Sequence, residues 1–327
     1  MDLRFLYSQL IETWRLPYPS GSYAGQTIII TGSNTGLGKE AARHYARLGA
    51  SRLILAVRNV ESGEEAKRDI QTTAAEGVSI EVWQVDMASY ASVKAFAARV
   101  DAELDRVDIF HANAGVARMV YALDEGNESN ITVNYLATFL LVALVLPKLK
   151  ATAARFNVRP TLAITNSDAH RHTTFPQRNE PDVLAALNDR NYAGGRHWVE
   201  QYPISKLLGI FAVRSIAKEH PADKYPVTIN LFSPGFCLSG LAREATGMMR
   251  VVFAIQKALL ARSTDRGSWT LLHAGRQGAE SHGQYFEDAK IARPSDVVTR
   301  NPDLQDRLWA DLKAKLEAIQ PGVTANF

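Results

Sequence analysis

Gln26-Thr-Ile-Ile-Ile-Thr-Gly-Ser-Asn-Thr-Gly-Leu-Gly38 runs from an apolar, β-branched segment directly into a glycine-rich turn. Such a β-branched run is typical of a strand buried on both faces. Residues 39–48 are predicted to form a helix after the turn. Glycines in this setting let the backbone approach a phosphate closely, and the helix N-terminus directs partial positive charge at it. The stretch therefore predicts a dinucleotide phosphate loop in preference to an ordinary glycine-rich turn.

The remainder of the chain alternates between strand-like and helix-like segments. We predict further strands over residues 52–57, 80–85, 107–112, 161–165, 227–233 and 284–286. We predict helices over residues 127–146, 263–275 and 304–319, the first of them ended by Pro147. Strands that alternate with helices indicate an α/β fold, a single Rossmann-type doubly wound parallel sheet with helices on both faces.

Composition excludes several classes of protein. The 327 residues are 46% hydrophobic and 22% charged with a net charge of +3, as in an ordinary globular domain, and no basic run suggests nucleic acid. Cys237 is the single cysteine, so no disulfide framework exists and a reducing compartment is expected. Met1–Trp14 lacks a signal peptide's apolar stretch, and the apolar run 139–146 is too short to span a bilayer. We expect a cytoplasmic protein.

We expect a helical extension over residues 1–20 and one domain over residues 21–327, which includes substrate loops at 170–201 and 236–262. Apolar residues recur in the extension at helical spacing: Leu3, Leu6, Tyr7, Leu10, Ile11 and Trp14. This pattern favours packing on the body of the protein over contact with a membrane interface, because few basic residues accompany it.

The ends of the second and third predicted strands bear on cofactor choice. Arg58 follows the second strand about 20 residues after Gly38, where a dinucleotide fold reads the adenosine ribose. An arginine there can clasp a 2′-phosphate through two donors, which predicts NADP(H). Asp86 and Met87 end the third strand, near the expected adenine. A helix cap is the alternative role for Asp86.

Tyr202 and Lys206 are four residues apart, so on a helix they share one face. A neighbouring ammonium should lower the pKa of the phenol and allow proton exchange with a carbonyl or alcohol oxygen. The pair Tyr90 and Lys94 has the same spacing, but it lies on the expected adenine side and is predicted to be unrelated to catalysis. Ser167 ends a central strand, where α/β sheets bind ligands.

Two loop regions carry further candidate residues. His170 and His172 are assigned to a loop or pocket wall, because no third metal ligand has suitable spacing. Residues 241–260 are predicted to form an amphipathic flap. Several apolar residues are candidates for a pocket that takes a hydrophobic or aromatic carbonyl, namely Phe175, Trp198, Phe236, Leu238, Met248, Met249 and Phe253.

Over residues 20–320 the ordered motifs resemble the short-chain dehydrogenase/reductase family. The motifs are Thr31-Gly-Ser-Asn-Thr-Gly-Leu-Gly38, Ala56-Val-Arg-Asn59, Asn113-Ala-Gly115, Asn134, Ser167-Asp-Ala-His170, Tyr202-Pro-Ile-Ser-Lys206 and Pro234-Gly235. They are most similar to the retinol dehydrogenase and WW-domain oxidoreductase branch, and to filamentous-fungal reductases of secondary metabolism.

The resemblance implies a role for each matching residue. Tyr202 would be the acid/base, Lys206 would tune it and bind the nicotinamide ribose, Ser167 would hold the substrate oxygen, and Asn134 would anchor a water chain. The implied cofactor-binding residues are Gly32, Asn34, Gly36, Leu37, Gly38, Arg58, Asp86, Met87, Asn113, Gly115, Tyr202, Lys206, Pro234, Gly235, Cys237 and Ser239. Ser239 replaces a usual threonine, and Ala112 replaces a usual asparagine.

The expected function is an NADP(H)-dependent ketoreductase or alcohol dehydrogenase without a metal. The alternatives are a retinol-dehydrogenase-like lipid carbonyl reductase and a non-catalytic NADP(H)-binding regulatory protein. The segment between Ser167 and Tyr202 is longer than usual for the family, so a substrate is not carried over from relatives. The resemblance also implies a homodimer.

Overall fold

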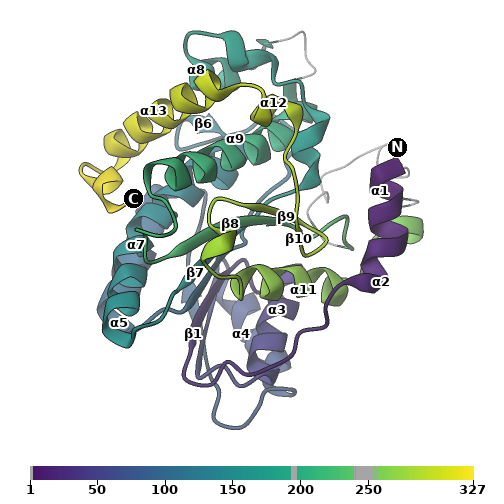
Figure 1. The fold of residues 1–327 in the computed structure, drawn as a ribbon, viewed down its shortest axis with the longest axis vertical. Coiled ribbons are helices and arrows are strands. Elements are labelled where there is room, and N and C mark those ends of the chain that lie inside the picture. The colour runs from purple at the N-terminus through teal and green to yellow at the C-terminus, as the bar shows by residue number, and fades with distance from the viewer. Residues whose placement is uncertain (1–2, 193–196, 239, 241–253, 255) are drawn as a thin grey trace.

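The computed structural model describes residues 3–192, 197–238, 240, 254 and 256–327. Its centre is a twisted eight-stranded sheet (Figure 1) in the order β10-β9-β8-β7-β4-β1-β2-β3. The strands are β1 (Thr27–Thr31), β2 (Arg52–Val57), β3 (Ser79–Gln84), β4 (Ile109–Ala112), β7 (Thr161–Thr165), β8 (Thr228–Ser233), β9 (Tyr285–Glu287) and β10 (Lys290–Ile291). The pairs are parallel apart from β9 with β10, which confirms the predicted doubly wound sheet.

Helices cover both faces of the sheet. One face carries α5 (Tyr90–Glu103), α7 (Ala137–Phe156), α9 (His197–Glu219) and α13 (Pro302–Ile319). The other carries α3 (Gly36–Arg47), α4 (Val60–Gln71) and α11 (Thr264–Gly275). Every residue of β1, β4 and β8 is buried, as the β-branched and apolar runs predicted.

Shorter elements complete the chain. They are β5 (Leu123–Asp124), β6 (Asn127–Glu128), α6 (Ser129–Ile131), η2 (Thr132–Leu136), η3 (Asp168–His172), η4 (Pro176–Asn179), α8 (Val183–Asn188), η6 (Ala279–Ser281), α12 (Asp296–Thr299) and η7 (Val323–Asn326). Ser129–Phe156 is long and apolar enough to cross a membrane, yet 94% of its most apolar window is buried inside the protein. The stretch is therefore a core helix here.

Pro147 does not end its helix, contrary to the prediction. It lies inside α7, which continues to Phe156 and ends at Asn157 in the left-handed conformation (φ 51°). Leu146, Leu149 and Ala153 on either side of the proline are buried. Their packing outweighs the backbone hydrogen bond that proline cannot make.

The predicted N-terminal helix is present as α1 (Leu3–Tyr7), η1 (Ser8–Glu12) and α2 (Thr13–Arg15), but its orientation is the reverse of the prediction. Gln9 and Glu12 are buried, whereas Leu3, Tyr7, Leu10, Ile11 and Trp14 are exposed. The polar side chains face the protein because they complete a buried hydrogen-bond cluster, described below. Most of the predicted flap, residues 241–253 and 255, lies outside the described residues.

Candidate active site

Three neighbouring strands are joined by hydrogen bonds at their carboxyl ends. The Thr31 hydroxyl oxygen accepts from the backbone N–H groups of Asn113 and Ala114, both at 2.9 Å. The Asn113 amide donates to Thr31 O (2.9 Å) and accepts from the Thr165 hydroxyl (3.1 Å). Asn113 therefore ties β1, β4 and β7 together where parallel sheets bind ligands.

The glycine loop leaves no room for a side chain where α3 meets this edge. A Cβ on Gly38 would lie 2.4 Å from Gly32 O and 2.7 Å from the Asn113 amide nitrogen. Gly32 and Gly36 adopt positive φ (68° and 62°), which only glycine adopts readily. The loop holds its backbone close to the start of α3, as a phosphate cradle requires.

The predicted adenosine side lies at the ends of β2 and β3. Gly32 N–H donates to Ala56 O (2.8 Å), so Arg58 follows the strand beside the glycine loop, and its side chain is exposed. Asp86 accepts from Ala88 N–H (3.0 Å), while Ser89, and not Asp86, caps α5. Met87 is buried. These placements agree with the predicted positions; the contacts to a nucleotide stay predictions.

Asn134 lies in η2, a single turn of π-helix that precedes α7. Its amide donates to Val116 O (2.8 Å) and the Ser205 hydroxyl (3.0 Å), and its oxygen accepts from Val116 N–H (2.9 Å). A Cβ built on Gly115 would lie 3.0 Å from Asn134 Oδ1 and 3.6 Å from Lys206 Nζ. Asn134, Gly115 and Lys206 therefore lie close together. Single turns of π-helix such as η2 are frequent at functional sites.

Tyr202 and Ser167 face each other from α9 and the end of β7. Burial of the Tyr202 phenol raises its pKa to about 12; hydrogen bonding with Ser167 lowers the pKa, and the Asp168 carboxylate raises it. The prediction that Lys206 lowers this pKa toward neutrality is therefore wrong for this structure. Burial is the largest cause of the raised pKa, and the Lys206 ammonium, 5.7 Å from the Tyr202 ring centroid, does not reverse it.

Lys206 points toward the strand end. Its ammonium donates to Thr165 O (3.0 Å), and the side chain is only 7% exposed. Burial lowers the pKa of Lys206 to about 8. The Asn166 amide donates to Lys206 O (3.0 Å) and accepts from Ser167 N–H (2.7 Å), so Asn166 links the lysine to the serine. A cation held this way can stabilise negative charge beside Tyr202.

Replacing this lysine tests the cost of its burial. Below pH 8 the ammonium is charged in both the folded and the unfolded protein, so folding bears the whole cost of burying it. Between about pH 8 and 10.5 only the unfolded state keeps the proton, so stability rises with pH. Lys206→Met removes this cost but also loses one hydrogen bond. The net effect should be a rise of roughly 2 kcal/mol in the free energy of unfolding at pH 7.

Urea denaturation at several pH values measures this effect. The stability gap between Lys206→Met and the native protein should narrow as the pH rises toward 10.5. Lys94→Met on α5 is the control and should leave the profile unchanged. A stability gap that widens as the pH rises would show that burial of the Lys206 charge does not destabilise the fold.

The pair Tyr90 and Lys94 lies apart from this site. Tyr90 begins α5, its N–H donates to Glu125 (2.8 Å), and its hydroxyl accepts from Asn127 at 3.5 Å. Burial is the largest cause that raises its pKa. These contacts support a structural role for Tyr90.

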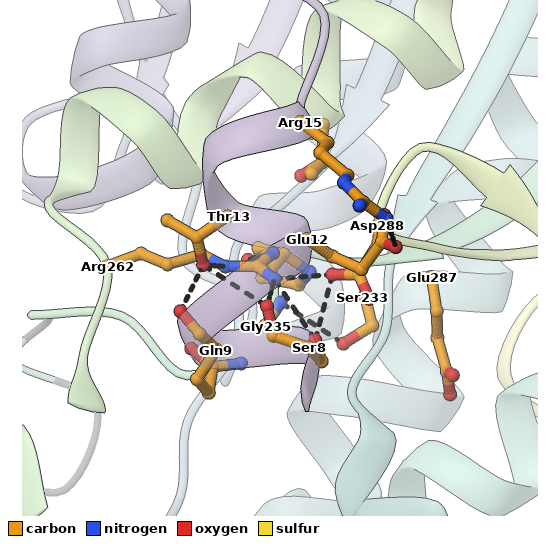
Figure 2. Close-up of polar contacts among 12 residues, drawn as sticks. Ser8, Gln9, Glu12, Thr13, Arg15, Ser233, Gly235, Arg262, Glu287 and Asp288 are labelled. Carbon is orange, nitrogen blue, oxygen red and sulfur yellow. Dashed lines mark hydrogen bonds and ion pairs between the residues drawn. The ribbon is translucent and has the colours of Figure 1, made fainter. Parts of the chain in front are cut away.

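Sequence reasoning missed Arg262, which connects the Pro234–Gly235 turn to the N-terminal helix (Figure 2). Its fully buried guanidinium donates to Pro234 O (3.1 Å), Ser8 O (3.0 Å) and the Thr13 hydroxyl (2.8 Å), and forms an ion pair with Asp288. A Cβ on Gly235 (φ 75°) would lie 2.7 Å from that guanidinium. A lone arginine at the end of the predicted substrate loop 236–262 carries no spacing signal, so sequence patterns cannot find it.

Cys237 lies just after this turn. It is buried, its thiol donates to Pro234 O (3.4 Å), and burial raises its pKa to about 12. The thiol is therefore a packing group rather than a nucleophile. Ser239, which the resemblance implies as a cofactor-binding residue, lies outside the described residues.

A cavity of about 190 Å³ opens between this turn, the end of β7 and the N-terminal helix. Its lining residues are Arg4, Phe5, Ser8, Asp168, Arg171, His172, Ser233, Gly235, Glu287 and Asp288. Burial raises the pKa of Asp168, which is next to Ser167. This wall is more polar than the predicted apolar pocket.

The residues predicted to line an apolar pocket do not all lie in one place. Phe175 is fully buried in the core and does not line the cavity, while Leu238 is half exposed. Phe236 packs against Phe5, with ring centroids 6.1 Å apart. The Trp198 side chain and Met248, Met249 and Phe253 lie outside the described residues. His170 is buried and accepts from Ser295 N–H (3.2 Å), so it is a structural histidine.

The buried ion pair between Arg262 and Asp288 is expected to contribute to the stability of the fold. Arg262→Met leaves the Asp288 carboxylate without its buried partner and should lower the free energy of unfolding by about 3–5 kcal/mol. Adding Asp288→Asn should restore much of that loss. The exposed pair Lys218–Asp306 is the control, and Lys218→Met should cost less than about 1 kcal/mol. Equal losses of unfolding free energy in Arg262→Met and Lys218→Met would show that Arg262 is not buried as described.

The chain belongs to the short-chain dehydrogenase/reductase family. The family model described as "short chain dehydrogenase" matches residues 26–156. Across 99% of both chains, 56% of residues are identical to the short chain dehydrogenase/reductase dmxR8 of Cryptosporiopsis sp. (strain 8999). The chain is also 41% identical to the short chain dehydrogenase atnD of Emericella nidulans, over 87% of this chain and 90% of that one. The family performs oxidoreduction of CH–OH and C=O groups with a nicotinamide cofactor.

Solved structures support the fold. A short chain dehydrogenase of Escherichia coli CFT073 complexed with NADPH has a TM-score of 0.60 at 22% identity, covering 83% of this chain and 99% of that chain. A short chain dehydrogenase of Shigella flexneri has a TM-score of 0.60 at 20% identity, covering 86% and 97%. The comparisons support the family; they do not confirm the retinol dehydrogenase branch.

Proposed function

We propose that the protein is an NADP(H)-dependent carbonyl reductase or alcohol dehydrogenase in which Tyr202 is the proton donor and acceptor. The observation that carries the proposal is the meeting of Tyr202, Ser167, Lys206 and Asn134 at the carboxyl edge of the sheet. Hydrogen bonds link this group through Thr165 to Asn113, which in turn contacts the glycine loop. A phosphate cradle and a proton-transfer group therefore occur along one edge.

The residues present fit a dinucleotide. A Cβ on Gly36 would project into open space at the N-terminus of α3, whereas Gly32 and Gly38 have backbone or side-chain atoms within 3.0 Å of such a Cβ, so the loop keeps a bare backbone surface there. Gly115, Asn113 and the Pro234–Gly235 turn would hold the rest of the molecule, with Asn34, Leu37, Asp86 and Met87 on its adenosine side. When bound, the nicotinamide supplies a hydride to the carbonyl carbon or takes one from the alcohol carbon.

The protein's own groups handle the proton. Ser167 and Tyr202 donate hydrogen bonds to the substrate oxygen as negative charge develops on it, and Tyr202 transfers its proton. The raised pKa of Tyr202 keeps the phenol protonated at neutral pH, as reduction requires. Lys206, as a cation, stabilises the phenolate left behind, and the role we propose for Asn134 is to anchor a water in the path that returns the proton.

NADP(H) is the proposed cofactor because Arg58 follows β2 and its side chain is exposed beside the glycine loop. One similar structure carries NADPH and another is a complex with NADP. The substrate we propose is a small hydrophobic or aromatic carbonyl compound or alcohol. Since the relatives are fungal enzymes with substantial identity, we propose a place in cytoplasmic secondary metabolism.

Removing the phenol tests the assignment of Tyr202. Tyr202→Phe should lower kcat by about 10²–10⁴-fold, because the proton donor is lost, and leave NADPH affinity nearly unchanged. NADPH consumption with a panel of ketones and aldehydes, together with NADPH fluorescence titration, measures both. Tyr90→Phe, which alters the tyrosine of the unrelated pair, is the control and should keep full activity.

Two outcomes would count against this assignment. Full activity in Tyr202→Phe would remove Tyr202 from the chemistry. NADPH binding by the native protein without turnover of any compound in a broad panel would favour a non-catalytic, nucleotide-sensing role.

A charge reversal tests the cofactor assignment. Arg58→Asp removes the donors for a 2′-phosphate and places a carboxylate beside it. The ratio of kcat/KM for NADPH to that for NADH should fall about 10–100-fold, the loss of a charged hydrogen-bond partner. Arg68→Asp, an exposed change on nearby α4, is the control. An unchanged ratio in Arg58→Asp would refute the role of Arg58.

A further inference from the structure

The N-terminal helix buries its polar side and exposes its apolar side, which is the reverse of an ordinary surface helix. Apolar residues recur every three or four positions along the helix. We call the side they form the outward face, and it consists of Leu3, Tyr7, Leu10, Ile11 and Trp14. These side chains are 82%, 50%, 49%, 42% and 74% exposed, respectively. A contiguous apolar face of this kind marks an interaction surface.

The buried contacts of the helix fix this orientation. Ser8 and Thr13 accept hydrogen bonds from Arg262, and Glu12 accepts from Lys290 at 2.6 Å. Arg15 also forms an ion pair with Glu12 (3.3 Å). Turning the outward face inward would break these contacts and leave the buried Arg262 guanidinium without its partners Ser8 and Thr13. The apolar face therefore stays outward as long as the hydrogen bonds of the helix with Arg262 and Lys290 are intact.

Charges around the outward face are arranged with cations outside and acids inside. Arg4 is 50% exposed against 14% for its partner Glu287. Arg15 and Lys290 are 60% and 63% exposed, whereas their shared partner Glu12 is 8% exposed. Exposed cations at Arg4, Arg15 and Lys290 therefore lie beside the apolar face, which complements an anionic surface.

Neighbouring segments extend the same surface. Leu238 is 50% exposed, and its N–H donates to Arg262 O (2.8 Å) beside the helix. Ile291 is 55% exposed and directly follows Lys290, which pairs with Glu12. In Figure 1 the N-terminal helix lies at the edge of the protein next to β10. Trp14 and Tyr7 are residues that favour the boundary between lipid and water.

We propose that the outward face docks the protein reversibly on the surface of a membrane that contains anionic lipids. The helix would lie in the interface, with its apolar side chains among the acyl chains and its cations at the lipid phosphates. Arg4, Phe5 and Ser8 of the same helix line the cavity that Asp168 also lines, so docking places that cavity next to the membrane. Apolar substrates dissolved in the membrane would then enter close to the site.

Vesicle co-sedimentation of the full-length protein tests docking without use of enzymatic activity. The probes are phosphatidylcholine vesicles with and without about 30% phosphatidylserine. Native protein should bind the anionic vesicles at least tenfold better than the neutral ones, and high salt should remove most of that difference. Leu3→Ser/Leu10→Ser/Trp14→Ser should lower binding at least tenfold and leave the unfolding temperature within a few degrees of native.

The matched control is Val60→Ser/Leu123→Ser/Val158→Ser, which alters exposed apolar residues on other elements and should bind as the native protein does. Absence of binding to anionic vesicles, or equal binding by both triple variants, would overturn the proposal. So would light scattering in which the helix variant, but not the control, converts a lipid-free oligomer to monomers, because the face would then join two copies. None of these readouts depends on the cofactor or the reaction.

Discussion

The backbone of Gly38 comes so close to Gly32 O and the Asn113 amide that no side chain fits between them. This close approach brings the start of α3 against the ends of β1 and β4. Asn113 then carries the connection to β7 through the Thr165 hydroxyl, and Thr165 O holds Lys206 of α9. The phosphate cradle and the predicted catalytic residues are thus parts of one connected edge.

The site holds charged and polar groups at a cost to stability. Burial pushes the pKa of Tyr202 up and that of Lys206 down, so each group is shifted toward its neutral form. Such opposed shifts are common where proton transfer is carried out. The large apolar core formed by α5, α7, α9 and α13 offsets this cost, and it places Asn134 and Lys206 on adjacent helices.

The doubly wound sheet and the gathering of candidate residues at the carboxyl ends of its strands could be predicted because both follow from local patterns. β-Branched runs, the glycine spacing and Tyr202–Lys206 are signals that adjacent residues carry. Three features could not be predicted, because they depend on contacts distant in sequence. Pro147 stays helical because of core packing around it, the N-terminal helix turns its polar side inward to meet Arg262, and burial rather than Lys206 decides the pKa of Tyr202.

A crystal structure of the complex with NADP tests the central claim most directly, since that claim places one dinucleotide along the whole edge. We expect the pyrophosphate at the N-terminus of α3, the 2′-phosphate beside Arg58, and the nicotinamide ring between the Tyr202 hydroxyl and the Pro234–Gly235 turn. A nicotinamide ring out of reach of Tyr202, or a nucleotide bound away from the glycine loop, would contradict it.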